Sequence, residues 1–64
     1  MNIAIAGMHS PACVKKVRMA LEKVEGLQVR EVGMGSTLVN GDAKQQAEAI
    51  AAIEKAGYQP HIAV

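Results

Sequence analysis

The 64-residue sequence contains almost no aromatic residues and a single cysteine. Tyr58 is the only aromatic side chain, although 50% of the residues are hydrophobic, so the core has to be built from aliphatic residues and methionine. Such a core packs closely and leaves no cavity of roughly 300 Å³ or more, the size that an organic substrate needs. The composition therefore argues against an elaborate enzyme.

An excess of charge and a long apolar run are missing as well. The net charge is +1, which provides no basic field for neutralising the phosphates of a nucleic acid. No apolar run approaches the ~20 residues that span a bilayer, and the residues after Met1 lack the pattern of a secretory signal. Cys13 has no partner for an internal disulfide, which suits a reducing compartment. We expect a cytoplasmic protein with no nucleic-acid partner and no membrane insertion.

The first half of the chain reads as strand, helix and strand. Residues 2–6 alternate with the period of a strand, and Gly7 opens a loop. Ser10 followed by Pro11 predicts a helix start in which the serine oxygen caps the helix. The helix is expected to run from residue 11 to about 25, with Gly26 as its left-handed end. Its apolar stripe consists of Val14, Val17, Leu21 and Val24.

A strand completes the first half, and residues 36–64 then repeat the order strand, helix and strand. Residues 27–32 predict a strand that needs a bulge, because Val29 and Val32 are an odd number of residues apart. A turn at 33–36 leads to a short strand over 37–40. Asp42 and Gln45 predict a capping box for a helix through Ala47, Ile50 and Ile53 to residue 56, before Gly57. Residues 58–64 predict the last strand, at an edge because of Pro60.

This element order predicts one domain over residues 1–64 with an α+β, ferredoxin-like βαββαβ fold. Right-handed crossovers place both helices on one face of a four-stranded antiparallel sheet with strand order 4132. In that order residues 7–13, 33–36 and 57–58 gather at the same end of the sheet. A functional site made from distant segments is therefore expected there.

The first of these segments resembles the metal-binding loop of heavy-metal-associated domains, the family of copper chaperones and metal-transporting ATPases. That family carries Gly-Met-Thr-Cys-x-x-Cys, and this chain has Gly-Met-His-Ser-Pro-Ala-Cys at residues 7–13. Residues 24–27 (Val-Glu-Gly-Leu) and 56–58 (Ala-Gly-Tyr) also match family habits. The resemblance implies the same fold and a site for a soft metal ion. Ser10 replaces the first family cysteine, so one of two thiolates is missing.

The candidate metal ligands are Cys13 and His9. Cys13 lies in the first turn of a helix, where unpaired amides and the macrodipole favour a thiolate, and the alternative is an inert thiol at the border of the core. His9 offers an imidazole from the same loop, and the alternative is an exposed loop histidine. Soft Cu(I) is the expected ion, with Ag(I), Zn and Hg as other soft or borderline candidates.

Three further residues are expected around these ligands. Ser10 is not expected to be a ligand, Met8 is expected to pack in the core beneath the loop as in the family, and Tyr58 is expected to shield the ion as in bacterial relatives. His61 lies too far along the last strand, roughly 10 Å from its start. Met34 is expected to be an exposed turn residue at the far edge of the sheet.

The leading hypothesis is a metal-binding carrier or chaperone module whose single-cysteine site is completed by His9 or by a second chain, which would make a metal-bridged homodimer. The resemblance implies a metal-transporting ATPase or a related metal-binding domain as partner, with basic residues of the first helix as docking residues. The alternative is a degenerate member that binds no metal and acts as an interaction or regulatory domain. An enzyme is not expected, because no general base is aligned with Cys13.

Overall fold

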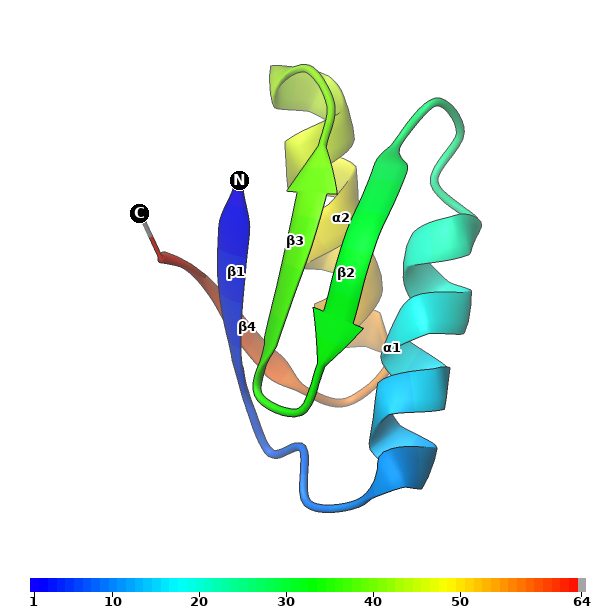
Figure 1. The fold of residues 1–64 in the computed structure, drawn as a ribbon. Helices are drawn as coiled ribbons and strands as arrows, with labels where there is room; N and C mark the ends of the chain where they lie inside the picture. Colours follow the sequence, from blue (N-terminus) through cyan, green and yellow to red (C-terminus); the bar gives the residue numbers. More distant parts are fainter. Residues whose placement is uncertain (64) are drawn as a thin grey trace.

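The chain folds in the order βαββαβ (Figure 1), and the computed structural model describes residues 1–63. The elements are β1 (Asn2–Ala6), α1 (Pro11–Glu22), β2 (Gln28–Gly33), β3 (Ser36–Asn40), α2 (Ala43–Lys55) and β4 (Gln59–Ala63). All six predicted elements are present, with ends that differ from the prediction by at most three residues. Val64, the predicted end of the last strand, lies outside the described residues.

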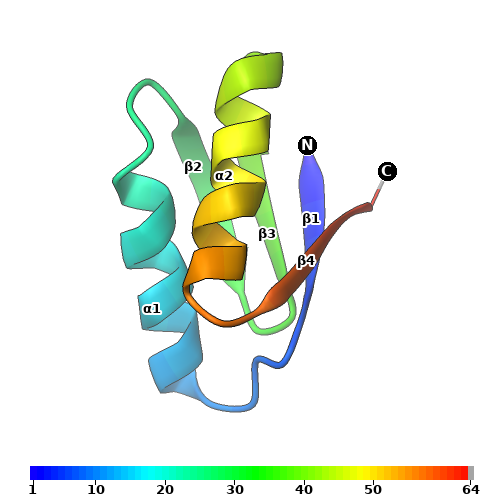
Figure 2. The ribbon, with the colours of Figure 1, turned by 180° about the vertical axis from the view of Figure 1, so that it is seen from behind.

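The four strands form one antiparallel sheet in the order β2-β3-β1-β4, which is the predicted order read from the opposite edge. Both helices cover the same face of this sheet, side by side (Figure 2). The α+β, ferredoxin-like prediction is therefore confirmed. β1 pairs with both β3 and β4, so the central strand leads directly into the loop before α1.

The core lies between the sheet and the two helices. Buried side chains come from β1, β3, both helices and the first loop, namely Ile3, Ile5, Met8, Val17, Leu21, Val39, Ala49 and Ile53. Each large aliphatic side chain removed from water contributes about 1.5–3 kcal/mol. Because the core is small, its few large side chains at Ile3, Leu21 and Ile53 carry much of the stability of the sheet-and-helix packing.

The predicted bulge in β2 is present. The pairing of β2 with β3 shifts between Val29 and Glu31, so that both Val29 and Val32 pack against the core although they are three residues apart. Beside the bulge, the buried Thr37 hydroxyl donates to the Glu31 carbonyl at 2.6 Å. The bulge thus resolves the pattern and satisfies a buried hydroxyl.

Two details of the helices differ from the prediction. α1 ends at Glu22 and not near residue 25, because Lys23 and Val24 donate to Ala20 and Leu21 in a tighter turn that keeps Val24 buried. Gly26 still has the predicted left-handed conformation, with φ of 81°. In α2 the buried stripe contains Ala49 with Ile53, whereas Ala47 is exposed.

β4 is an edge strand, as Pro60 predicts. Ile5 is the register partner of Pro60, and the Ile5 amide donates to the Gly35 carbonyl at 2.8 Å, toward the other side of β1. Since backbone groups alternate in direction along an antiparallel pair, the nitrogen of Pro60 faces the open edge. The absence of an amide hydrogen at Pro60 therefore removes no hydrogen bond between β1 and β4, and it hinders pairing of another strand at this edge.

Three segments meet at one end of the sheet, as predicted. The loop after β1, the β2–β3 hairpin and the connection from α2 to β4 all lie there (Figure 1). The Gly35 amide in the hairpin donates to the Met8 sulfur at 3.4 Å, which ties two of the segments together. Within residues 1–63, no helix has the length and apolar character needed to cross a membrane.

Candidate metal centre

The loop between β1 and α1 has its buried and exposed residues in a fixed order. Gly7 takes a positive φ of 96°, which turns the chain away from the sheet. Met8 then points into the core and is only 7% exposed, as predicted. His9 is exposed, and Ser10 occupies the N-cap position of α1 with extended backbone angles. Met8 thus anchors the loop from below and leaves residues 9 and 10 at the surface.

Cys13 is the third residue of α1 and is half-buried. Its amide donates to the Ser10 carbonyl at 3.0 Å, and its sulfur lies 3.6 Å from the Ser10 hydroxyl oxygen. The thiol packs against the edge of the core without being enclosed by it. A sulfur in this position remains accessible to an ion that approaches the loop.

The surroundings of Cys13 favour its thiolate. A hydrogen bond with the Tyr58 hydroxyl is the largest cause, followed by the His9 backbone and the Ser10 hydroxyl, and together they lower the pKa of Cys13 to about 6. Each of these groups stabilises the charged form by hydrogen bonding, and partial burial opposes them only weakly. At neutral pH the sulfur is therefore mostly a thiolate, the form that binds metals.

Tyr58 immediately precedes β4 and reaches the loop across the end of the sheet. Its amide donates to the Ile53 carbonyl at 3.3 Å, which fixes the residue at the end of α2. Its ring lies against Gly7, where a β-carbon would be 3.6 Å from the ring. The interaction with Cys13 raises the pKa of Tyr58, so the Tyr58 hydroxyl keeps its proton at neutral pH. Tyr58 thus lies at the end of the sheet where it was expected, and the pKa shifts of both groups link its hydroxyl to the Cys13 thiol.

The predicted capping role of Ser10 is wrong. Its side chain makes no capping hydrogen bond to the amides of α1, although its backbone occupies the N-cap position. The hydroxyl lies beside the Cys13 sulfur instead. The physical reason is that the thiol at the third helical position competes for the same hydroxyl, and a thiolate is the stronger acceptor.

The remaining candidates lie where they were expected. His61 pairs with Ala4 in the sheet, whereas Ile3 and Ile5 face the helices. Since neighbours along a strand point to opposite faces, His61 lies on the face without helices, away from Cys13. Met34 is 53% exposed in the β2–β3 turn. Neither residue joins the group formed by Cys13, Ser10 and Tyr58.

The donor set of one chain is small. Among residues 1–63, no group of three or more histidine, cysteine or acidic side chains is arranged to hold a metal ion. One thiolate suits a soft ion. The hydroxyls of Tyr58 and Ser10 act as hydrogen-bond partners of the Cys13 sulfur and not as ligands of the ion. The residues present therefore fit a soft ion that takes at least one more donor from the loop or from another molecule.

Comparisons with solved structures find similar domains, two of which are copper binding or metal binding domains. A copper binding domain from HMA7, a P-type ATPase, has a TM-score of 0.89 and 25% identity, covering 100% of this chain and 92% of that one. The N-terminal domain of PacS from Synechocystis PCC6803 has a TM-score of 0.83 and 28% identity, over 98% and 94% of the two chains. The C-terminal metal binding domain of CopA has a TM-score of 0.76 and 32% identity, over 92% and 81%.

The sequence itself gives the same result. Residues 2–59 match the family model described as the heavy-metal-associated domain, a range that includes the loop, both helices and the beginning of β4. The match extends over nearly the whole chain and agrees with the observed element order and strand order. The chain therefore belongs to the heavy-metal-associated domain family.

Proposed function

We propose that this protein binds Cu(I) through the Cys13 thiolate and acts as a metal-carrying module. Membership of the heavy-metal-associated family supports the binding of a heavy-metal ion, a role in which the protein binds and does not catalyse. The specific ion and the single-cysteine site go beyond that membership. The observation that carries the proposal is the Cys13 sulfur, which is half-exposed at the metal-loop position and held as a thiolate by Tyr58, His9 and Ser10.

The choice of Cu(I) follows from ligand chemistry. Thiolate is a soft ligand that selects Cu(I) over hard cations such as Mg²⁺ and Ca²⁺. Two of the similar solved structures are a copper binding domain and a metal binding domain. Ag(I), Zn and Hg would meet the same sulfur and are the ions to test beside copper. Ser10 and Tyr58 interact with the Cys13 sulfur, and Met8 anchors the loop from the core, so all three would shape the site without ligating the ion.

A second donor has two candidate sources. His9 is exposed in the same loop, and its backbone interacts with the Cys13 sulfur, so its imidazole is the first candidate. Cys13 of a second chain would instead give two thiolates across a two-fold axis and a metal-bridged homodimer. The two arrangements predict different stoichiometries, one ion per chain against one ion per two chains.

The proposed partner is a metal-binding domain of a metal-transporting ATPase. Exposed basic side chains on α1 and at its end would meet an acidic surface of that domain. Lys15, Lys16 and Arg18 lie on the helix, and Lys23 is its C-cap, at the end away from the loop. Electrostatic attraction of this kind raises the rate of association more than the affinity. The location of this exchange in the cytoplasm stays a prediction based on the single cysteine.

The test is an anaerobic Cu(I) titration in competition with a chromogenic chelator, followed by native mass spectrometry. The wild type is compared with Cys13→Ala and His9→Ala. We expect the wild type to withdraw copper and Cys13→Ala not to. Loss in His9→Ala with one ion per chain assigns the second donor to His9, whereas one ion per two chains with His9→Ala unaffected assigns it to the second Cys13.

One observation favours a second function. Ser10 stands where the family has its first cysteine, and residues 1–63 hold no cluster of three potential ligands. On this alternative the fold serves as a protein-interaction or regulatory domain and binds no metal. Failure of both the wild type and Cys13→Ala to compete for copper would support it and would exclude the carrier function.

A further inference from the structure

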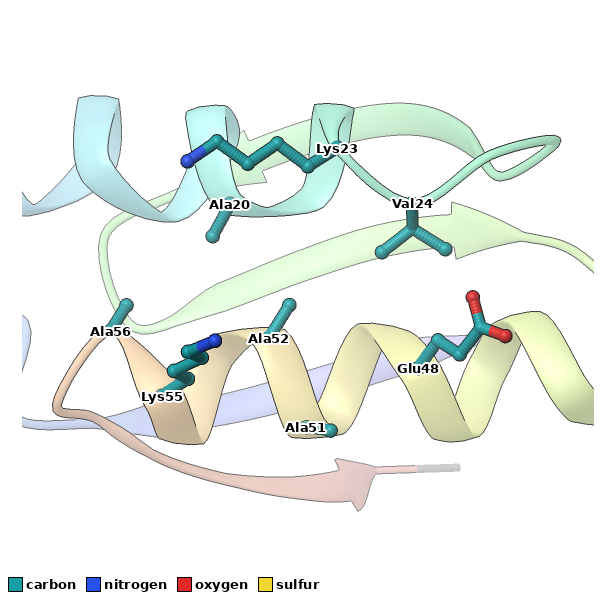
Figure 3. Close-up of a pocket in the computed structure, with 8 residues that line it drawn as sticks. All are labelled: Ala20, Lys23, Val24, Glu48, Ala51, Ala52, Lys55 and Ala56. Carbon is teal, nitrogen blue, oxygen red and sulfur yellow. The ribbon is translucent and has the colours of Figure 1, made fainter.

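A groove runs between α1 and α2 on the side of the helices that faces away from the sheet (Figure 3). Its volume of about 530 Å³ shows that the expectation of no space above roughly 300 Å³ was wrong, because the space lies between the helices and not inside the aliphatic core. The groove includes none of the residues of the metal loop. Its floor is made of small apolar side chains, and its rim carries charges. The apolar residues are Ala20, Val24, Ala51, Ala52 and Ala56, and the charged residues are Lys23, Glu48 and Lys55.

The charges of the groove are separated by sign along its length. In Figure 3 the ammonium groups of Lys23 and Lys55 lie toward the Ala56 end, and the Glu48 carboxylate lies toward the opposite end. Glu48 and Lys55 are seven residues apart on α2, about 10.5 Å along the helix axis. That separation is too long for an ion pair within one chain. Lys55 also has only alanines one turn before it, at positions 51 and 52.

This arrangement is complementary to itself. In an antiparallel pair of α2 helices centred between Ala51 and Ala52, position 48 of one helix lies opposite position 55 of the other. Glu48 of each chain would then face a lysine, and the two alanines would meet at the crossing point. Small side chains there allow the helix axes to approach to about 8 Å, the short end of the usual range.

We infer that the groove between α1 and α2 is a contact surface for a second copy of this chain, arranged about a two-fold axis between Ala51 and Ala52. In this dimer, Glu48 pairs with Lys55 of the partner subunit, and Lys55 pairs with Glu48 of the partner subunit. The contact is isologous, so each favourable pair occurs twice. An anionic small molecule fits less well, because Glu48 would repel it from one end of the groove.

The association is weak and reversible. Both pairs are exposed, and exposed ion pairs contribute little individually. The groove is lined by eight residues, fewer than the roughly 20–30 residues that each partner contributes to a standard stable interface. We therefore expect a dissociation constant of roughly 0.1–1 mM, which is detectable by sedimentation equilibrium or NMR line widths at comparable concentrations.

The decisive test uses two charge reversals, Glu48→Lys and Lys55→Glu. In a homodimer of either variant, positions 48 and 55 carry the same charge and face each other twice across the axis. Each variant alone is therefore expected to associate less than the wild type. An equimolar mixture restores opposite charges at both pairs, and we expect it to associate at least about tenfold more tightly than either variant alone. A mixture that stays as monomeric as its components would overturn the inference.

Two features separate this test from copper binding and from misfolding. All proteins carry Cys13→Ala and contain no metal, so failure of the carrier function leaves the result unchanged. The matched controls are Lys44→Glu and Glu54→Lys, which make the same charge changes on exposed positions of α2 outside the groove. Their mixture should show no gain over the single variants, and circular dichroism verifies that every variant is folded. A gain of equal size in the control mixture would show general charge attraction and overturn the assigned surface.

Discussion

The two helices begin with the same spacing but use it differently. In α2, Asp42 and Gln45 stand at the N-cap and third positions and close a full capping box, with hydrogen bonds of 2.8 and 2.9 Å. In α1, Ser10 and Cys13 stand at the same two positions, yet their side chains face each other at 3.6 Å and cap nothing. Equivalent positions in the two halves of the fold therefore serve stability in one helix and the thiol in the other.

This difference shows how the site is supported. A capping side chain consumes helix amides, whereas an uncapped start leaves polar groups directed at a thiolate. Pro11 at the first helical position reduces the number of amides left without an acceptor, because proline has no amide hydrogen. The missing capping hydrogen bond makes α1 less stable, and the Ser10 hydroxyl instead helps to lower the pKa of Cys13 to about 6.

The largest expected effect follows from Ser10→Cys, which puts a second thiolate beside the first. Two sulfurs that bind the same ion, each at about 2.3 Å, lie at most about 4.6 Å apart, with the zinc–thiolate bond length as a guide. The Ser10 oxygen and the Cys13 sulfur are 3.6 Å apart. We expect Cu(I) affinity to rise by at least about 100-fold. Loss of a residue that only hydrogen-bonds to a metal ligand already lowers metal affinity by about 10–100-fold, and Ser10→Cys adds a ligand itself.

Chelator competition under reducing conditions measures this gain, and native mass spectrometry should show one ion per chain. Ser10→Ala is the matched control, because it removes the hydroxyl without adding a ligand. An unchanged affinity in Ser10→Cys would mean that the loop does not direct the two side chains to a common ion.

The next effect concerns Tyr58→Phe, which removes the largest cause of the lowered pKa of Cys13. Since the hydroxyl stabilises the thiolate, its loss raises the pKa from about 6 toward the ordinary value of 9.0. The rate of alkylation by iodoacetamide follows the thiolate. In the wild type that rate should fall only as the pH drops through about 6, and in the variant the fall should begin at a higher pH.

A thiol titration by alkylation over about pH 5–9, a range that brackets both pKa values, resolves the two curves. Tyr58 is half-exposed at the end of the sheet, so phenylalanine fits without new burial. Superimposable rate profiles for the two proteins would refute the contact between the Tyr58 hydroxyl and the sulfur.

The strands, the bulge and the capping box were predictable because each leaves a short-range signal. The odd spacing of Val29 and Val32 implied the bulge, and Asp42 with Gln45 implied the box. The buried stripe of α2 was harder, since alanine occurs at five of its positions and fits a buried or an exposed face alike. Periodicity then gave Ala47 in place of Ala49.

The site was predictable only in part for a similar reason. The gathering of three segments at one end followed from topology, and Cys13 followed from its position in the helix. The direction of the Ser10 hydroxyl did not, because helix amides and a thiolate lie within reach of the same side chain. The contact of Tyr58 with the sulfur joins residues 45 positions apart and leaves no local pattern.

A smaller effect, on stability, distinguishes the two helix starts. Asp42→Ala removes a working cap and should lower the free energy of unfolding by about 1 kcal/mol. Ser10→Ala removes no capping bond and should cost clearly less. Urea denaturation at neutral pH compares the two variants with the wild type. Equal losses would contradict the difference in capping between α1 and α2.

The smallest expected change in stability comes from Ser10→Asp, which offers α1 the cap that α2 already has. A carboxylate at the N-cap is favoured by the free amides and the helix dipole, so the free energy of unfolding should rise by about 0.5 kcal/mol. The same carboxylate lies beside the Cys13 sulfur, and like charges disfavour each other, so the pKa of Cys13 should rise. Urea denaturation and alkylation rates measured on this one variant should therefore move in opposite senses, with higher stability and a less reactive thiol at neutral pH. If both improved together, the uncapped start of α1 would not be a condition for the thiolate, and the contrast between the two helices would have another cause.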